Sequence, residues 1–171
     1  TYTLRGAKIR NPLVWSKMLQ EVMDMWGDKA EVLFTSHSWP VWGKDTIIKH
    51  LSVGRAGYRY INDQTLHLAS LGYTPDEIGD MIRFPEKLDS YWSMRGHYGT
   101  LSHNAKGTFN YYLGYFDCNP SALHPLPPAQ SAPRYIELMG GDKAVLEKGQ
   151  QAFDQGDYRW AAELLNKVVF A

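Results

Sequence analysis

The stretch TSHSWPVWG, Thr35 to Gly43, places a histidine directly after a short apolar run, AEVLF, that is typical of a strand. Functional groups of open α/β layers commonly lie at the carboxyl ends of strands. At such a place the imidazole of His37 could bind a metal ion or act in catalysis. A histidine packed at the rim of an aromatic core would show the same pattern. The residues alone leave both interpretations open.

A second concentration of polar and aromatic side chains surrounds a predicted helix start in RGHYGTLSHNAKGTFNYYLGYF. The backbone N–H groups at the start of a helix favour negative charge, so this cluster could hold an anion. An aromatic-rich helix edge that only packs against its neighbours is the alternative. The side chains concerned are His97, Tyr98, His103, Asn104, Tyr111 and Tyr112.

Two arginines, Arg5 and Arg10, follow the first predicted strand. A planar guanidinium can bind an oxyanion through two parallel hydrogen bonds. By composition alone, each is better explained as an ordinary surface or salt-bridged arginine.

The sequence lacks the short motifs that mark a complete site. Its six histidines form no H-x-H, H-x-x-H or H-E-x-x-H pattern, so a full set of metal ligands is not local in sequence. There is no G-x-S-x-G motif and no phosphate-binding glycine loop. The single cysteine, Cys118, excludes an internal disulfide framework. The remaining histidines His50, His67 and His124 are predicted to be structural.

The composition is that of a folded globular protein. Hydrophobic residues make up 44% of the 171 residues and charged residues 21%. Aromatic residues make up 13%, which indicates a large core, an interface or an apolar substrate surface. The 18 basic and 18 acidic residues balance, and no Lys/Arg cluster appears, which argues against nucleic-acid binding. No apolar run approaches the ~18 residues of a membrane span.

The elements that must position these residues begin with a predicted strand, helix and strand. TYTL alternates like a strand, and apolar spacings of three and four residues predict a helix over 12–26. Asn11 is its predicted N-cap, with Pro12 as the first helical residue. The sequence GDKAEVLFT then predicts a turn and a second strand. This order is typical of the last layer of an α/β unit.

After Gly43 the sequence predicts almost only helices. Gly72 is predicted to end a long helix, and Thr74 and Glu77 to form the capping box of the next. A further helix is predicted over 102–116, with Ser102 or Asn104 near its cap. The proline-rich stretch NPSALHPLPPAQSAP is predicted to be a rigid connection within the structure, not a domain linker.

The tail, AVLEKGQQAFDQGDYRWAAELLNKVV, resembles a tetratricopeptide helix pair in the places of its small and aromatic residues. A single unit of this kind cannot bury both faces alone, so we expect a helix hairpin packed on the preceding helices, not an array. The residues that match are Gly149, Ala152, Gly156, Tyr158, Ala161 and Leu165.

Several long motifs in order closely resemble the bacterial alkyl sulfatases that degrade dodecyl sulfate. They are YTLRGA, SHSWPVWG, INDQTLHLASLGYTPDEIGDMIRFP, RGHYGTLSHNAKGTFNYYLGYFDCNPSALHPLPP and GDYRWAAELLNKVVFA, and they cover essentially the whole chain. The resemblance implies a mainly α chain, with a helical dimerisation domain over 44–171 that carries the tetratricopeptide-like hairpin. It implies that 1–43 are a short β-α-β remnant, the C-terminal edge of a metallo-β-lactamase-like αββα catalytic domain.

The same resemblance implies roles for individual residues. His37 matches a zinc ligand of a two-zinc site, and Arg5 matches a sulfate-binding residue. His103 and Tyr111 match residues that line the substrate pocket. Three further pocket candidates without a firm role are Arg10, Tyr98 and Asn104. The implied reaction is the metal-assisted hydrolysis of an alkyl sulfate ester to an alcohol and sulfate, carried out by a homodimer.

One departure from the family limits what this chain could do. The H-x-H-x-D-H motif that supplies most zinc ligands in the family is absent. A hydrolytic zinc site needs about three protein ligands for each metal ion. We therefore expect a fragment that is inactive by itself and that acts with a missing N-terminal catalytic segment of the same protein. A non-catalytic helical interaction module is the alternative. The family is compatible with a periplasmic or secreted location, and the compartment itself stays unknown.

Overall fold

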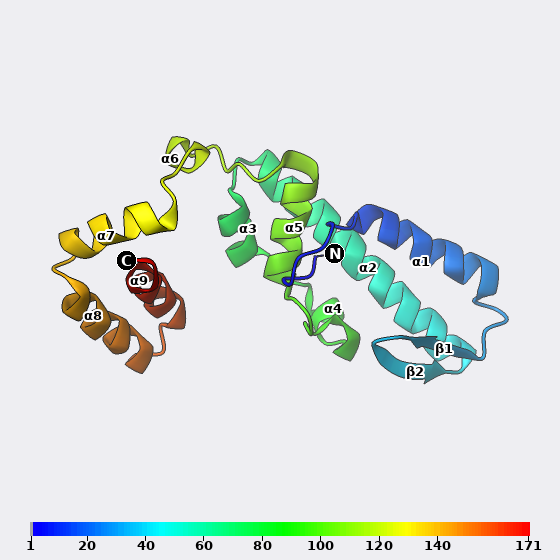
Figure 1. Ribbon diagram of the computed structural model, residues 1–171. Coiled ribbons are helices and arrows are strands. Elements are labelled where there is room, and N and C mark those ends of the chain that lie inside the picture. Colours follow the sequence, from blue (N-terminus) through cyan, green and yellow to red (C-terminus); the bar gives the residue numbers. More distant parts are fainter. Residues whose placement is uncertain (1) are drawn as a thin grey trace. The chain divides into compact units, whose positions relative to one another are not determined.

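The computed structural model describes residues 2–171 and divides into two compact units, one ending at Cys118 and the other spanning Asn119–Ala171. Both units consist mainly of helices, so the predicted mainly α fold class is confirmed (Figure 1). The division between the units lies just before the proline-rich stretch. The predicted domain boundary near residue 43 does not coincide with a division in packing, and it stays a prediction.

Two long helices form the frame of the first unit. Helix α1 (Pro12–Trp26) packs along α2 (Lys44–Ser70), as Figure 1 shows. The predicted cap of α1 is confirmed, because the Asn11 side chain accepts a hydrogen bond from the Val14 backbone N–H at 3.1 Å. Gly72, with a φ of +90°, follows the end of α2 in the left-handed region that favours glycine.

The strands of the first unit differ from the predicted order. Residues 2–10 form no strand; they run as an irregular loop with a turn in which the Gly6 N–H donates to the Thr3 carbonyl. Thr1, the first residue of the predicted strand, lies outside the described residues. Strand β1 (Val32–Thr35) instead pairs antiparallel with β2 (Ser38–Trp42), and Ser36 and His37 form the turn between them. The order is therefore helix, strand, strand.

The core of the first unit lies where α2 meets α3 (Pro75–Met81) and α5 (Leu101–Leu113). Between α3 and α5 the chain forms the short helix α4 (Glu86–Asp89) and a 3-10 turn, η1 (Trp92–Met94). The buried residues that join the three helices are Leu68, Ile78, Ile82, Ala105 and Phe109. Ile78 is fully buried at this junction.

Two helix caps in this region test the local predictions. The predicted capping box of α3 is confirmed: the Thr74 N–H and hydroxyl each donate to the Glu77 carboxylate at 2.8 Å, which lowers the pKa of Glu77. The cap of α5 is Thr100, whose hydroxyl accepts from the His103 N–H, and not the predicted Ser102 or Asn104. Those two residues lie in the first turn of the helix.

The second unit contains α6 (Pro120–Leu123), α7 (Pro128–Leu138), α8 (Asp142–Asp154) and α9 (Tyr158–Phe170). Its core is formed by Ile136, Val145 and Leu164, one from each of the last three helices. The proline-rich stretch is partly helical, because prolines stand at the first positions of α6 and α7.

The predicted helix hairpin at the end of the chain is present as α8 and α9. A Cβ at Gly149 would lie 2.7 Å from Cδ2 of Leu165, so the small residue is required for this close contact. Gly156, with a φ of +80°, lies in the turn between the two helices. The predicted resemblance of this helix pair to a tetratricopeptide repeat stays a prediction. No helix within residues 2–171 is long and apolar enough to cross a membrane.

Candidate functional site

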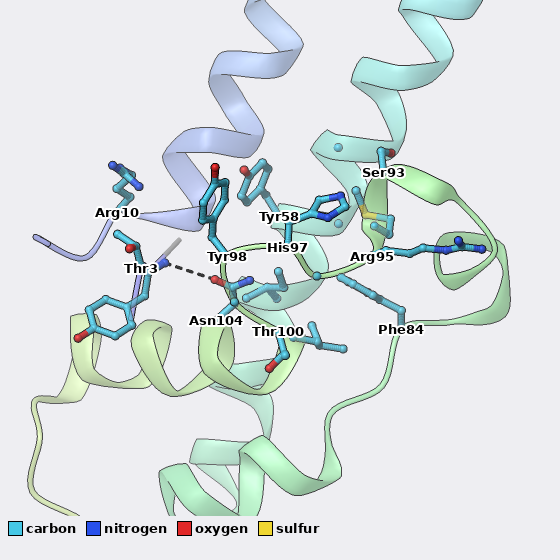
Figure 2. Close-up of a pocket in the computed structure, with 18 of the residues that line it drawn as sticks. Thr3, Arg10, Tyr58, Phe84, Ser93, Arg95, His97, Tyr98, Thr100 and Asn104 are labelled. Atoms are coloured by element: carbon cyan, nitrogen blue, oxygen red, sulfur yellow. Dashed lines mark hydrogen bonds between the residues drawn. The ribbon is translucent and has the colours of Figure 1, made fainter. Parts of the chain in front are cut away.

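A cavity of about 400 Å³ lies inside the first unit. Its wall comes from five parts of the chain: the N-terminal loop, the turn of the β-hairpin, the middle of α2, Phe84 just before α4, and the segment from η1 to the start of α5. Figure 2 labels residues from all of these parts except the hairpin turn. Met94 can approach α2 closely at the position of Gly57, where a Cβ would lie 2.6 Å from its sulfur atom. The cavity is therefore built by contacts between segments that are far apart in sequence.

Five of the seven predicted site residues line this cavity. They are Arg5, Arg10, His37, Tyr98 and Asn104. Arg5 and Arg10 come from the N-terminal loop, whereas Asn104 comes from the first turn of α5. The fold thus brings together residues separated by up to about a hundred positions, although their chemical roles stay predictions.

His37 is exposed at the turn of the β-hairpin, where its ring meets the ring of Tyr98 edge-on with centroids 5.5 Å apart. Among residues 2–171, however, no group of three or more His, Cys, Asp or Glu side chains could hold a metal ion. The described residues therefore do not complete a zinc site by themselves.

The two arginines of the N-terminal loop give the cavity a positive character. Within residues 2–171, neither Arg5 nor Arg10 forms an ion pair with a carboxylate. Figure 2 shows Arg10 and Arg95 at opposite edges of the cavity. Guanidinium groups without a carboxylate partner remain available to an anionic ligand.

Tyr58, on α2, adds a hydroxyl to the same wall. Burial raises the pKa of Tyr58, and the positive charge of Arg10 opposes this shift. The phenol therefore stays protonated at neutral pH and can donate a hydrogen bond. Its ring stacks on Trp15 of α1 with centroids 5.6 Å apart, which holds the side chain in place.

The other two predicted residues, His103 and Tyr111, do not line the cavity. Nδ1 of His103 lies 3.2 Å from the hydroxyl of Thr100, the residue that caps α5. The Tyr111 hydroxyl accepts a hydrogen bond from Nδ2 of Asn11 at 3.2 Å. In this structure both side chains therefore contact the protein's own cap and loop residues.

The family model for alkyl sulfatase dimerisation matches residues 74–171, more than half of the chain. The chain belongs to this family. The matched region begins at the capping box of α3 and includes α5 and the whole second unit.

Individual alkylsulfatases extend the similarity beyond the matched region. A linear primary-alkylsulfatase from a Pseudomonas species is 53% identical over all 171 residues, and an (R)-specific secondary-alkylsulfatase from a Pseudomonas species is 41% identical over 170 residues. The solved structure of the stereoselective inverting sec-alkylsulfatase Pisa1, from Pseudomonas, covers 98% of this chain with a TM-score of 0.94 at 40% identity.

This member of the alkyl sulfatase dimerisation family spans about a quarter of the length of the curated relatives it matches. The chain likewise covers 26% of the Pisa1 chain. The comparisons therefore assign a fold and a family to this chain. The activity, substrates and partners of a whole alkylsulfatase can only be proposed for it.

Several cavity residues were not singled out from the sequence of this family member. Tyr58 lies within the long helix that was predicted to end at Gly72, and neither it nor Phe84, Ser93 and Thr100 carried a signal of its own. His97 belonged to the cluster predicted around the helix start, and Arg95 stands two residues before it in the motif RGHYG, so this adjacency was the available signal for Arg95. The helical position of Tyr58 could be assigned to the cavity only from the packing of α2.

Proposed function

We propose that this chain is part of an alkyl sulfatase, a sulfuric ester hydrolase, and that it supplies one wall of the site that binds the sulfate group. Arg5 and Arg10, both free of carboxylate partners among the described residues, line one cavity with His37 and Tyr98. This observation supports the binding of an oxyanion, because two guanidinium groups offset its charge and can donate paired hydrogen bonds.

The apolar part of the wall supports an alkyl sulfate as the ligand. Ile61, Phe84 and Met94 line the same cavity as the arginines. Figure 2 shows Phe84 well apart from Arg10. A ligand with a sulfate head and a hydrocarbon chain would match these two kinds of surface.

We propose that only one residue of this chain binds zinc. We propose that His37 is the ligand this chain contributes to a two-zinc site, and that 1–43 belong to a metallo-β-lactamase-like domain whose other residues precede this segment. The described residues lack a complete ligand set. The contribution of this chain is therefore the binding and orientation of the sulfate group.

We also propose that the chain joins two copies into a homodimer, in keeping with the family to which it belongs. Apolar side chains of the second unit support an interaction surface there, because Leu138 is 83% exposed and Val169 is 77% exposed. Sedimentation equilibrium on the purified chain should give twice the monomer mass at high micromolar concentration. A mass that stays monomeric there contradicts the dimerisation role.

The hydrolase proposal is tested by measuring sulfate release from dodecyl sulfate. The intact protein loaded with zinc should release sulfate and dodecanol in equal amounts, whereas the 171-residue chain alone should release none, because its described residues hold no complete metal site. Dodecyl phosphate serves as the control substrate. An intact, zinc-loaded protein that leaves dodecyl sulfate unchanged would favour the alternative, a non-catalytic helical interaction module.

A further inference from the structure

We propose that α5 holds the N-terminal loop at both ends, which makes Gly107 and Tyr111 positioning residues for the arginines of the cavity. This inference rests on the proposed sulfate-binding role of Arg5. The loop of residues 2–10, together with Asn11 at the N-cap of α1, is attached to one helix at both ends, through Tyr2 and through Asn11. We call these two attachments the Tyr2 anchor and the Asn11 anchor.

The Tyr2 anchor combines a hydrogen bond with a close approach. The Tyr2 N–H donates to Oδ1 of Asn104 at 3.3 Å, the bond drawn as a dashed line in Figure 2. The side chain of Tyr2 packs against α5 at Gly107, where a Cβ would lie 2.8 Å from Cβ of Tyr2 and 3.4 Å from its Cγ. Glycine is therefore the residue that lets the loop lie this close to the helix.

The Asn11 anchor is a group of side-chain hydrogen bonds. Nδ2 of Asn11 donates to the Tyr111 hydroxyl at 3.2 Å, and the Tyr112 hydroxyl lies 3.4 Å from Oδ1 of Asn11. The same Tyr112 hydroxyl donates to Oδ1 of Asn62, a buried residue of α2, at 2.8 Å. Because Asn11 also caps α1, this anchor ties the end of the loop to three helices.

The spacing along α5 explains how one helix can serve both anchors. Asn104, Gly107 and Tyr111 are separated by three and four residues, which places them on one face of an α-helix. Arg5 and Arg10 lie on the loop between the two anchors. Any shift of either anchor should therefore move the guanidinium groups relative to the rest of the cavity.

This arrangement gives Tyr111 a role different from the one predicted. Its hydroxyl contacts Asn11 and not the cavity, so it acts on the ligand through the loop. A direct sulfate ligand and a positioning residue differ in one measurable way. The effect of a positioning residue should disappear once the arginine it positions has been removed.

The experiment uses Gly107→Ala and Tyr111→Phe in the intact protein, each also combined with Arg5→Ala. Gly107→Ala should raise KM for dodecyl sulfate about tenfold by displacing the loop, with kcat changed by less than about twofold. Tyr111→Phe, which removes one hydrogen bond and keeps the ring, should raise KM about threefold. On the Arg5→Ala background both effects should fall below about twofold.

Hydrogen exchange supplies a readout that does not depend on activity. Amides of residues 3–10 should exchange several-fold faster in Gly107→Ala than in the unchanged protein. Gly79→Ala is the matched control, because its added Cβ would also meet α5 closely, at 2.7 Å from Cε of Lys106 and 2.8 Å from the Ser102 hydroxyl. It lies away from the loop and should leave the exchange of 3–10 and KM unchanged.

The outcomes separate the two proposals. Unchanged exchange and unchanged KM in both variants would overturn the anchoring. Effects on KM that persist in full on the Arg5→Ala background would overturn the positioning role, because they would not pass through Arg5. If exchange becomes faster but Arg5→Ala itself leaves both KM and kcat/KM unchanged, the sulfate-binding role of Arg5 is wrong and the positioning role fails with it. Should Gly107→Ala not fold, Tyr111→Phe decides alone.

Discussion

Replacing Arg5 by alanine in the intact protein is expected to lower kcat/KM for dodecyl sulfate by about 100- to 1,000-fold, the range found when a single oxyanion donor is removed. Arg5 lines the cavity and has no carboxylate partner within the described chain, so its guanidinium is free to bind an anion. Arg5→Lys keeps the charge but loses the two parallel N–H donors, and it should recover only part of the loss. Steady-state kinetics measure both variants.

The matched control for Arg5 lies on the same loop. Lys8 is an exposed cation that does not line the cavity, so Lys8→Ala changes the net charge equally without removing a cavity donor. It should change kcat/KM by less than about twofold at physiological ionic strength, where exposed charges are largely screened. Equal losses in the two variants would mean that general charge, and not the guanidinium of Arg5, carries the effect.

Replacing His37 by alanine is expected to lower both the zinc content and the activity of the intact protein. The imidazole stands in the turn of a β-hairpin beside Tyr98, and an alanine there leaves a metal without one nitrogen ligand. Removing a residue that only hydrogen-bonds to a metal ligand lowers metal affinity by about 10- to 100-fold. Removing the ligand itself should therefore lower the zinc affinity by at least about 100-fold. Zinc per subunit, measured by mass spectrometry after dialysis, and sulfate release give the two readouts.

His67→Ala is the control for His37, because His67 is an exposed histidine of α2 outside the cavity. It should keep the zinc content and the activity of the unchanged protein. If His37→Ala binds zinc normally and hydrolyses dodecyl sulfate, the ligand assignment is wrong, and His37 would be a residue that only packs against Tyr98.

Helix starts and stops were the most predictable features of this chain. The Asn11–Pro12 start, the Thr74–Glu77 capping box and the end of α2 before Gly72 all agree with the structure. Each depends on hydrogen bonds and backbone angles within four residues, so the sequence contains all the partners. The cap of α5 was misplaced by two to four residues because Thr100, Ser102 and Asn104 are all capable of capping.

Strands were less predictable because their partners need not be neighbours in sequence. TYTL alternates like a strand, but the Tyr2 backbone N–H bonds to the Asn104 side chain, about a hundred residues away. Conversely, Ser38–Trp42 was not predicted as a strand, and it contains a central proline, a residue that is rare inside strands. It nevertheless pairs with Val32–Thr35, because a proline can be tolerated in a two-stranded hairpin with free outer edges.

The sequence by itself determined the helices, the family and the identity of the residues that could bind an anion, because these depend on local patterns and on ordered motifs. Only the tertiary structure decided which of those residues meet. It places Arg5, Arg10, His37, Tyr98 and Asn104 around one cavity, and it leaves Tyr111 outside as an anchor of the loop. The reason is physical: the cavity arises where α5 packs on α2 and holds the N-terminal loop, and such long-range contacts depend on shape complementarity that no local pattern encodes.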